Sequence, residues 1–192
     1  MKLRMVLPVE IAVICLLGAI YYGYNAVKGP DPKPESSRTA TATPSAVPKV
    51  TTTRLVSKKG GFAVGVPDHV TAKKVGFTVQ MMTADKVLSV LVGPVERGKL
   101  SASSSAFMRS MKKAYKDVRV TRSEDQTIDG HQAKATYGRA ENAKKVPMSF
   151  VNVVVKANPR NYAITAFTTG SSDPIFVVPR VNAIVDTFEV IK

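Results

Sequence analysis

The sequence predicts an α+β protein in which an N-terminal transmembrane helix precedes a mostly antiparallel sheet covered by two helices. Three observations support this prediction. Residues 11–27 form an uncharged, apolar run, followed by a stretch rich in Pro, Ser and Thr. Behind that stretch, short apolar runs alternate with turn signals, as in hairpins of antiparallel strands. Two further segments carry apolar residues at helical spacing, so each is expected to cover the sheet with its apolar side.

The membrane anchor is expected within residues 1–28. As a helix, residues 11–27 would rise about 26 Å, and the residues just before them extend this past the ~30 Å of a hydrocarbon core. Lys2 and Arg4 precede the run and favour a cytoplasmic N-terminus, while three tyrosines near its far end suit a membrane–water interface. We therefore expect a single-pass protein of the cell membrane, with its folded domain outside the cytoplasm.

Two processed forms are alternatives to this uncleaved signal anchor. A secreted form needs a cleavage site with small residues, whereas the best candidate, Ala26, has the bulky Tyr24 two positions earlier. A lipoprotein would be lipidated at Cys15, which follows Ile14 where a small residue is usual. Because this is the only cysteine, the folded domain can form no internal disulfide.

Residues 29–57 are expected to be a disordered linker, because proline, serine and threonine alternate there with almost no large apolar side chain. Residues 58–192 are expected to form one α+β domain. This length buries enough surface for a stable core without disulfides. The domain holds 21 Lys and Arg against 11 Asp and Glu, which makes it strongly basic.

The strands expected in this domain lie at residues 62–66, 77–82, 86–95, 118–128, 131–141, 148–157 and 162–168. Asp129-Gly130 is a strong two-residue turn signal between two of them. One helix is expected at residues 103–116, capped by Ser101 or Ser103. Its apolar stripe comprises Phe107, Met111, Ala114, Tyr115 and Val118.

The second helix is expected to start at Asp173-Pro174, which has the form of a cap followed by a first helical residue. Pro179 either kinks this helix or marks its proper beginning. Its buried stripe would comprise Val177, Val181, Ile184, Val185 and Phe188. With short hairpin connections and two amphipathic helices, the domain should be a layered sandwich.

These features together resemble the PsbP-like α-β-α sandwich family, which has membrane-anchored and lipoprotein members in bacteria. The resemblance covers residues 60–192 and is carried by the opening strand, the turn into the middle strand, and the last helix. The matching residues are Gly61-Phe62-x-x-x-Val66-Pro67, Asp129-Gly130-His131-Gln132-Ala133, Tyr162 and Phe188. The resemblance implies a fold but no function, because its members include photosystem accessory subunits, a partner of a small GTPase and uncharacterised envelope proteins. No catalytic residues come with it.

Enzymatic motifs are weak in this sequence. Residues 93–100 match the spacing of a phosphate-binding loop, but Leu100 replaces the hydroxyl that holds magnesium and Pro94 removes a backbone donor. Ser110-x-x-Lys113 lacks the companion motifs of penicillin-binding enzymes. The two histidines, His69 and His131, come without a zinc motif. The carboxylates Glu124, Asp125 and Asp129 lack the spacing of a calcium loop. We predict no metal, cofactor or catalytic residue.

A basic face is the most informative functional signal. Its cations lie opposite the apolar stripe of the first helix and just beyond it: Arg109, Lys112, Lys113, Lys116, Arg119 and Arg122. Such a face could bind anionic lipid or a cell-wall polymer, or simply confer solubility. Nucleic acid is not expected, because no aromatic residues interleave with the cations.

The sequence therefore favours a non-catalytic, membrane-anchored binding or accessory domain of the cell envelope. Its partner could be anionic lipid, a wall polymer or a membrane protein complex. One alternative is an envelope enzyme whose site converges in space and is not readable as a motif. Another is a structural or assembly role for the anchor helix itself.

Overall fold

The computed structural model describes residues 50–170 and 174–191, within a compact unit that spans Pro48–Lys192. The predicted anchor of residues 1–28 and most of the predicted linker lie outside the described residues. Among the helices that are described, none has the length and apolar character needed to cross a bilayer.

The described chain runs through ten strands and two helices. Their order is β1 (Thr52–Ser57), β2 (Phe62–Pro67), β3 (Val70–Val75), β4 (Thr78–Thr83), β5 (Leu88–Val95), α2 (Leu100–Ala114), β6 (Lys116–Ile128), β7 (His131–Glu141), β8 (Pro147–Val155), β9 (Asn161–Thr169), α3 (Pro174–Asp186) and β10 (Glu189–Val190). The strands form a three-stranded sheet, β1-β2-β10, and a seven-stranded sheet, β3-β4-β5-β9-β8-β7-β6. Every pairing is antiparallel, which agrees with the short connections expected from the sequence.

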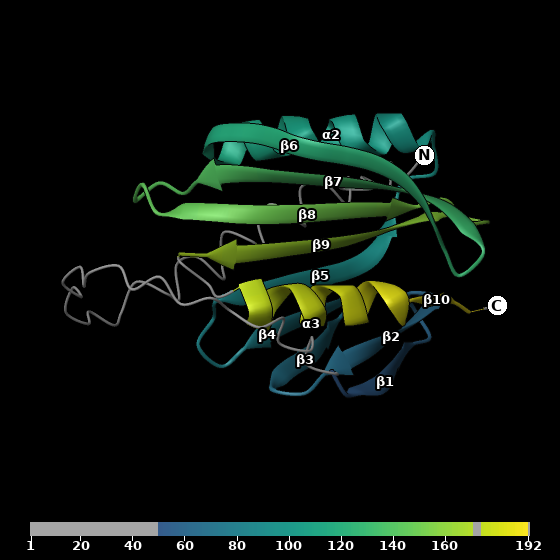
Figure 1. The fold of residues 1–192 in the computed structure, drawn as a ribbon. Helices are drawn as coiled ribbons and strands as arrows, with labels where there is room; N and C mark the ends of the chain where they lie inside the picture. Colours follow the sequence, from purple (N-terminus) through teal and green to yellow (C-terminus); the bar gives the residue numbers. More distant parts are fainter. Residues whose placement is uncertain (1–49, 171–173, 192) are drawn as a thin grey trace, which may run out of the picture. The chain divides into compact units, whose positions relative to one another are not determined.

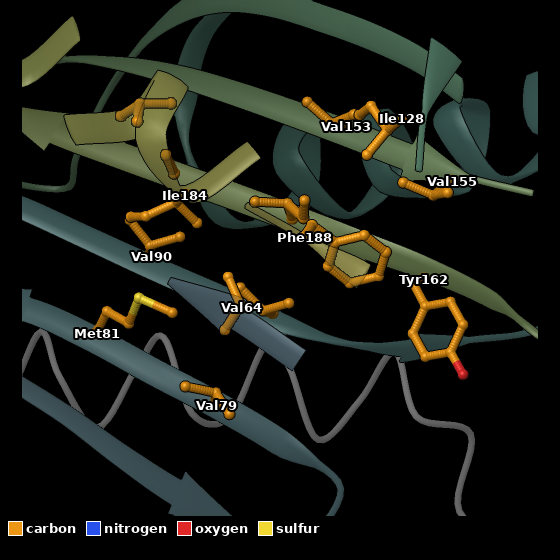
Figure 2. Close-up of a cluster of buried hydrophobic side chains, with 14 of the residues drawn as sticks. Val64, Val79, Met81, Val90, Ile128, Val153, Val155, Tyr162, Ile184 and Phe188 are labelled. Atoms are coloured by element: carbon orange, nitrogen blue, oxygen red, sulfur yellow. The ribbon is translucent and has the colours of Figure 1, made fainter. Parts of the chain in front are cut away.

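The larger sheet lies between two layers (Figure 1). Helix α2 packs against β6, β7 and β8 on one face. On the other face, α3 packs against β9, and it also packs against β2 of the smaller sheet. On the α3 side, Val64 of β2, Ile184 of α3 and Val90 of β5 belong to one buried cluster (Figure 2). The predicted α-β-α sandwich is therefore confirmed for the described domain.

Aromatic contacts join the layers. Phe188, just after α3, stacks on Phe62 of β2 at a centroid distance of 5.9 Å, and Tyr162 of β9 lies 5.5 Å from the same Phe188 ring. On the opposite face, Phe107 of α2 meets Phe150 of β8 edge to face at 5.7 Å. Such aromatic pairs add about 0.5–1.5 kcal/mol each beyond the area that they bury.

The structure corrects the predicted start of the domain. Thr52–Ser57 belongs to the predicted linker of residues 29–57, yet all its residues pair with β2 as strand β1. The stretch contains only two large apolar residues, Leu55 and Val56, so its composition resembles a linker. Tertiary pairing with the buried strand β2 stabilises an extended conformation that the composition of this segment does not indicate.

Two more strands and both ends of the first helix differ from the prediction. β3 was not predicted, because Lys73 and Lys74 interrupt its apolar pattern; it is an exposed edge strand. The short β10 was not predicted either. Helix α2 begins at Leu100 with Lys99 as its N-cap and no side-chain cap bond, so neither predicted serine caps it. It ends at Ala114, which is exposed, and the predicted stripe residue Val118 lies in β6.

Candidate binding surfaces

The outermost strand of the larger sheet, β6, carries three of the predicted cations on one face. Lys116 lies opposite Glu141 of β7, Arg119 opposite Arg139, and Arg122 opposite Tyr137, with register shifts between the three positions. Side chains of a regular strand alternate between faces, so a spacing of three would place Arg119 opposite to its two neighbours. Each shift adds one residue to β6, and all three cations thereby share a face.

The register continues across the next two strands. Arg139 lies opposite Ser149 of β8, and Ser149 lies opposite Thr168 of β9. Cross-strand partners share a face of the sheet. Arg119, Arg139, Ser149 and Thr168 therefore form one transverse line of hydrogen-bond donors, which we call the arginine row. Its first three members are exposed and Thr168 is half-buried.

The face that bears the arginine row is the α3 side of the sheet. Tyr137 and Val151 occupy the next transverse line, and both pack against the core cluster on that side. The row thus lies where the buried core gives way to a solvent-exposed sheet surface. It is built on strands, which hold side chains more firmly than loops do.

A polar network holds the neighbouring line in place. The Tyr137 hydroxyl donates to Glu124 Oε1 at 2.9 Å, and Glu124 also forms an ion pair with Arg122. The Arg122 guanidinium lies over the Tyr137 ring, 5.8 Å from its centroid. Burial, followed by the hydrogen bond to Glu124, raises the pKa of the Tyr137 phenol, which therefore remains a donor at neutral pH. Arg122 is thus partly neutralised.

The remaining predicted cations lie on the other side of the sheet. Helix α2 packs through Phe107, Met111 and Tyr115, so Arg109, Lys112 and Lys113 point outward, and all three are exposed. The face that α2 covers includes Phe150 and Gly138, opposite to the face of Tyr137. The sheet therefore separates the six predicted cations into a helix group of three and a β6 group of three.

Prediction from sequence did not identify Arg139, Ser149 or Thr168 as members of a site. Nothing in their local sequence distinguishes them, because they are brought together only by strand register. The spacing of Lys116, Arg119 and Arg122 fits a helix better than a strand. Only the two β-bulges show that this spacing places the three side chains on one face of the sheet.

The other motifs weighed above take ordinary structural positions. Leu100 begins α2, and the Asn161 side chain donates to the Gly98 carbonyl at 3.0 Å, which fixes the preceding loop. His69 sits in an exposed turn with its ring 3.8 Å from Asp68, whereas His131 begins β7. Among the residues whose placement is described, no group of three metal-binding side chains occurs.

The predicted carboxylate cluster is already engaged within the domain. Glu124 accepts from Tyr137, Asp125 pairs with Lys134 at 3.2 Å, and Asp129 accepts the Val190 backbone N–H at 2.8 Å. These bonds go to two strands, β7 and β10. The carboxylates thus serve as structural partners.

An open groove of about 580 Å³ lies where β1, the β2–β3 turn and β3 meet. Its lining mixes apolar side chains such as Leu55 and Val66 with the polar Asp68, His69 and Lys74. Among the described residues that line it, none is a Ser or Cys that could act as a nucleophile. The groove is therefore a weaker candidate for a catalytic site than the arginine row is for a binding site.

Comparison with solved structures identifies the fold. The chain resembles cyanobacterial PsbP (CyanoP) from Synechocystis with a TM-score of 0.55 and 14% identity, covering 78% of this chain and 98% of that one. It resembles the Ran-binding protein Mog1p of Saccharomyces cerevisiae with a TM-score of 0.55 and 9% identity, covering 74% and 97%. LpqN of Mycobacterium tuberculosis matches with a TM-score of 0.49 and 12% identity, covering 74% and 92%.

No family model and no curated protein matches the sequence. The described domain has the PsbP-like fold, as the resemblance noted from its sequence implied. At these identities the first two superpositions show the fold alone, so any function must be argued from the surfaces of this chain.

Proposed function

We propose that this chain is a single-pass protein of the cell envelope, whose PsbP-like domain lies outside the cytoplasm and binds an anionic partner without catalysing a reaction. The observation that carries the proposal is the arginine row, a set of cationic and hydroxyl donors aligned on rigid strands. Its anchoring rests on the apolar run of residues 11–27.

The two arginines of the row face one another across the β6–β7 pair. Arg119 and Arg139 are direct cross-strand partners, and like charges in such pairs are destabilising. Among the described residues, no carboxylate forms an ion pair with either one. An oxyanion bound between them would relieve this repulsion, which gives the row a preference for an anionic ligand.

The geometry of the donors favours a phosphate or carboxylate group. A guanidinium presents its N–H groups as a planar fork that can bind two oxygens of one oxyanion. The hydroxyls of Ser149 and Thr168 extend the same line toward β9 and can donate to further oxygens. A partner with several anionic groups could therefore contact the row along its length.

The fold is compatible with such a role. Mog1p, which has the same fold, is a Ran-binding protein, so this sandwich can serve binding. In the loops and groove of the described domain, no nucleophile and base form an arrangement as well defined as the arginine row. A binding or accessory role is therefore the function that the observations favour.

The proposal is tested by titrating the full-length chain, in detergent micelles, with pyrophosphate at constant ionic strength while its thermal unfolding is followed. A ligand that binds only the folded state raises the unfolding temperature. We expect such a rise for the wild-type chain. In the double variant Arg119→Gln/Arg139→Gln, apparent affinity should fall at least about tenfold, because charge-assisted hydrogen bonds are lost. The pyrophosphate should be recovered unhydrolysed.

The matched control is Lys112→Gln/Lys113→Gln, which removes the same charge from the outer side of α2. It should bind pyrophosphate as the wild type does. Equal losses in the two double variants would reduce the row to general electrostatic attraction and contradict the proposal. Release of inorganic phosphate by the wild-type chain would instead favour the alternative of an envelope enzyme.

A further inference from the structure

Several turns gather at one end of the domain and carry a concentration of positive charge. They are the β1–β2, β3–β4, β5–α2 and β8–β9 turns. Their cations are Lys58, Lys59, Arg97, Lys99, Lys156 and Arg160, which we call the basic end. All are exposed except Arg160, which is half-buried.

Specific contacts hold these turns side by side. The Tyr162 hydroxyl, beside the β8–β9 turn, donates to the Gly61 carbonyl at 2.9 Å. The Asn161 side chain binds the β5–α2 loop at Gly98, 3.0 Å away. A Cβ atom on Gly60 would lie 2.6 Å from the Phe77 carbonyl oxygen, so the β1–β2 and β3–β4 turns touch. The basic end is therefore one continuous surface.

Few carboxylates offset this charge. Glu96 is the only acidic residue on the four turns. The nearby Asp129 accepts a hydrogen bond from Val190, and Glu189 pairs with Arg54 at 2.7 Å. Within the described residues, none of the six cations takes part in an ion pair. The surface thus keeps a strong net positive charge.

An exposed aromatic side chain projects from the same end. Phe77 is 57% exposed and occupies the two-residue turn between β3 and β4, after Gly76. Most of the aromatic residues in this domain pack against other rings or the core. A bare phenyl ring at a hairpin tip gains free energy when it leaves water.

We propose that the basic end docks the domain on the surface of an anionic lipid bilayer, with the Phe77 ring inserted at the interface. Anionic lipid gives the bilayer a negative surface potential, which attracts cations. An adjacent apolar side chain strengthens binding when it leaves water for the lipid interface. A hydrophilic polyanion would satisfy the cations and leave Phe77 in water. The bilayer is therefore the partner that uses both features.

This docking needs neither the arginine row nor any conclusion about residues 1–28. The row uses β6 to β9 on the α3 face, whereas the basic end uses turns at the strand ends. The two surfaces can therefore be tested separately.

The absence of tryptophan from the chain provides a direct probe. In Phe77→Trp, the new indole is the single tryptophan of the full-length protein. The protein is combined with phosphatidylcholine bilayers, with or without phosphatidylglycerol, and its emission is recorded. We expect a shift to shorter wavelength with phosphatidylglycerol alone, reversed by high salt because surface attraction is screened.

Two comparisons make the test specific. Val178→Trp places an indole at another exposed apolar position, on α3, and should show no shift. Adding Lys58→Gln and Lys59→Gln to Phe77→Trp should weaken docking about fivefold per removed cation. Adding Lys112→Gln/Lys113→Gln, or Arg119→Gln/Arg139→Gln, should leave it unchanged.

The proposal is overturned if the Phe77→Trp emission is the same in both bilayers. It is also overturned if Val178→Trp shifts equally, or if soluble polyphosphate produces the same shift as phosphatidylglycerol, which would indicate a polyanion site. If the wild-type chain docks on the bilayer but does not bind pyrophosphate, only the proposal for the arginine row is refuted.

Discussion

At the scale of single residues, Gly138 of β7 shows how closely the backbone of β6 packs against its neighbour. A Cβ atom there would lie 2.5 Å from the Arg119 carbonyl oxygen, and closer still to the Phe150 ring. Gly138 is opposite both Val120 and Phe150. The missing side chain therefore lets the bulged backbone of β6 approach while Phe150 packs beneath α2.

We expect Gly138→Ala to destabilise the domain by about 2 kcal/mol or more, because overpacking forces backbone or ring displacement. Urea unfolding of wild type and variant measures the difference. Gly98→Ala is the matched control, since a Cβ atom there meets nothing within 4 Å. It should leave stability nearly unchanged. If Gly138→Ala were equally neutral, the close approach of β6 would not be required.

At the scale of elements, strands with strong local patterns could be predicted from the sequence, whereas strands formed by tertiary pairing could not. His131–Glu141 was predicted with its observed bounds, because Ala133 and Ala135 alternate with polar residues and Asp129-Gly130 supplies the turn. β3 has only a broken pattern, since Lys73 and Lys74 occupy its middle. The composition of β1 resembles that of a linker, and only its pairing with β2 defines it as a strand.

The candidate surfaces were predictable only in part, for the same reason. Arg119 and Arg122 were singled out from the sequence, but they were grouped with the α2 cations because they lie just beyond the predicted helix in the sequence. Their true neighbours, Arg139 and Ser149, follow from register and bulges, which no local signal specifies. Phe77 was expected inside a strand and instead occupies an exposed turn.

The role of β1 leads to a prediction about the domain boundary. A chain that begins at Pro48 should be more stable than one that begins at Lys58, by about 2 kcal/mol or more. The shorter chain loses the ladder of β1 with β2 and the packing of Leu55 against the core. Thermal unfolding of both chains tests this. Equal stability would mean that β1 is dispensable and that the linker extends to residue 57.

At the scale of the whole molecule, the chain combines a predicted anchor with a domain in which three separate surfaces carry clustered positive charge. These are the outer side of α2, the arginine row and the basic end. The full sequence carries a formal net charge of +14, which promotes association with anionic surfaces in general. Distinguishing the three surfaces therefore requires matched charge variants.

The proposed location yields its own prediction. After cell disruption and washing of the membranes with high salt, the full-length chain should remain in the membrane fraction, because a hydrophobic span is not released by screening of charge. Protease added to intact cells or spheroplasts should cut within residues 29–51 and release the domain. Recovery of a chain that retains residues 1–28 in the soluble fraction would exclude the anchor.

The two β-bulges of β6 have a second consequence, besides placing its cations on one face of the sheet. β6 forms one margin of the larger sheet, where free amide and carbonyl groups could recruit a strand from a neighbouring molecule. The bulges interrupt the even spacing that such recruitment requires, and Lys116, Arg119 and Arg122 add repulsion between identical copies. Many copies crowded together should therefore resist edge-to-edge polymerisation at this margin.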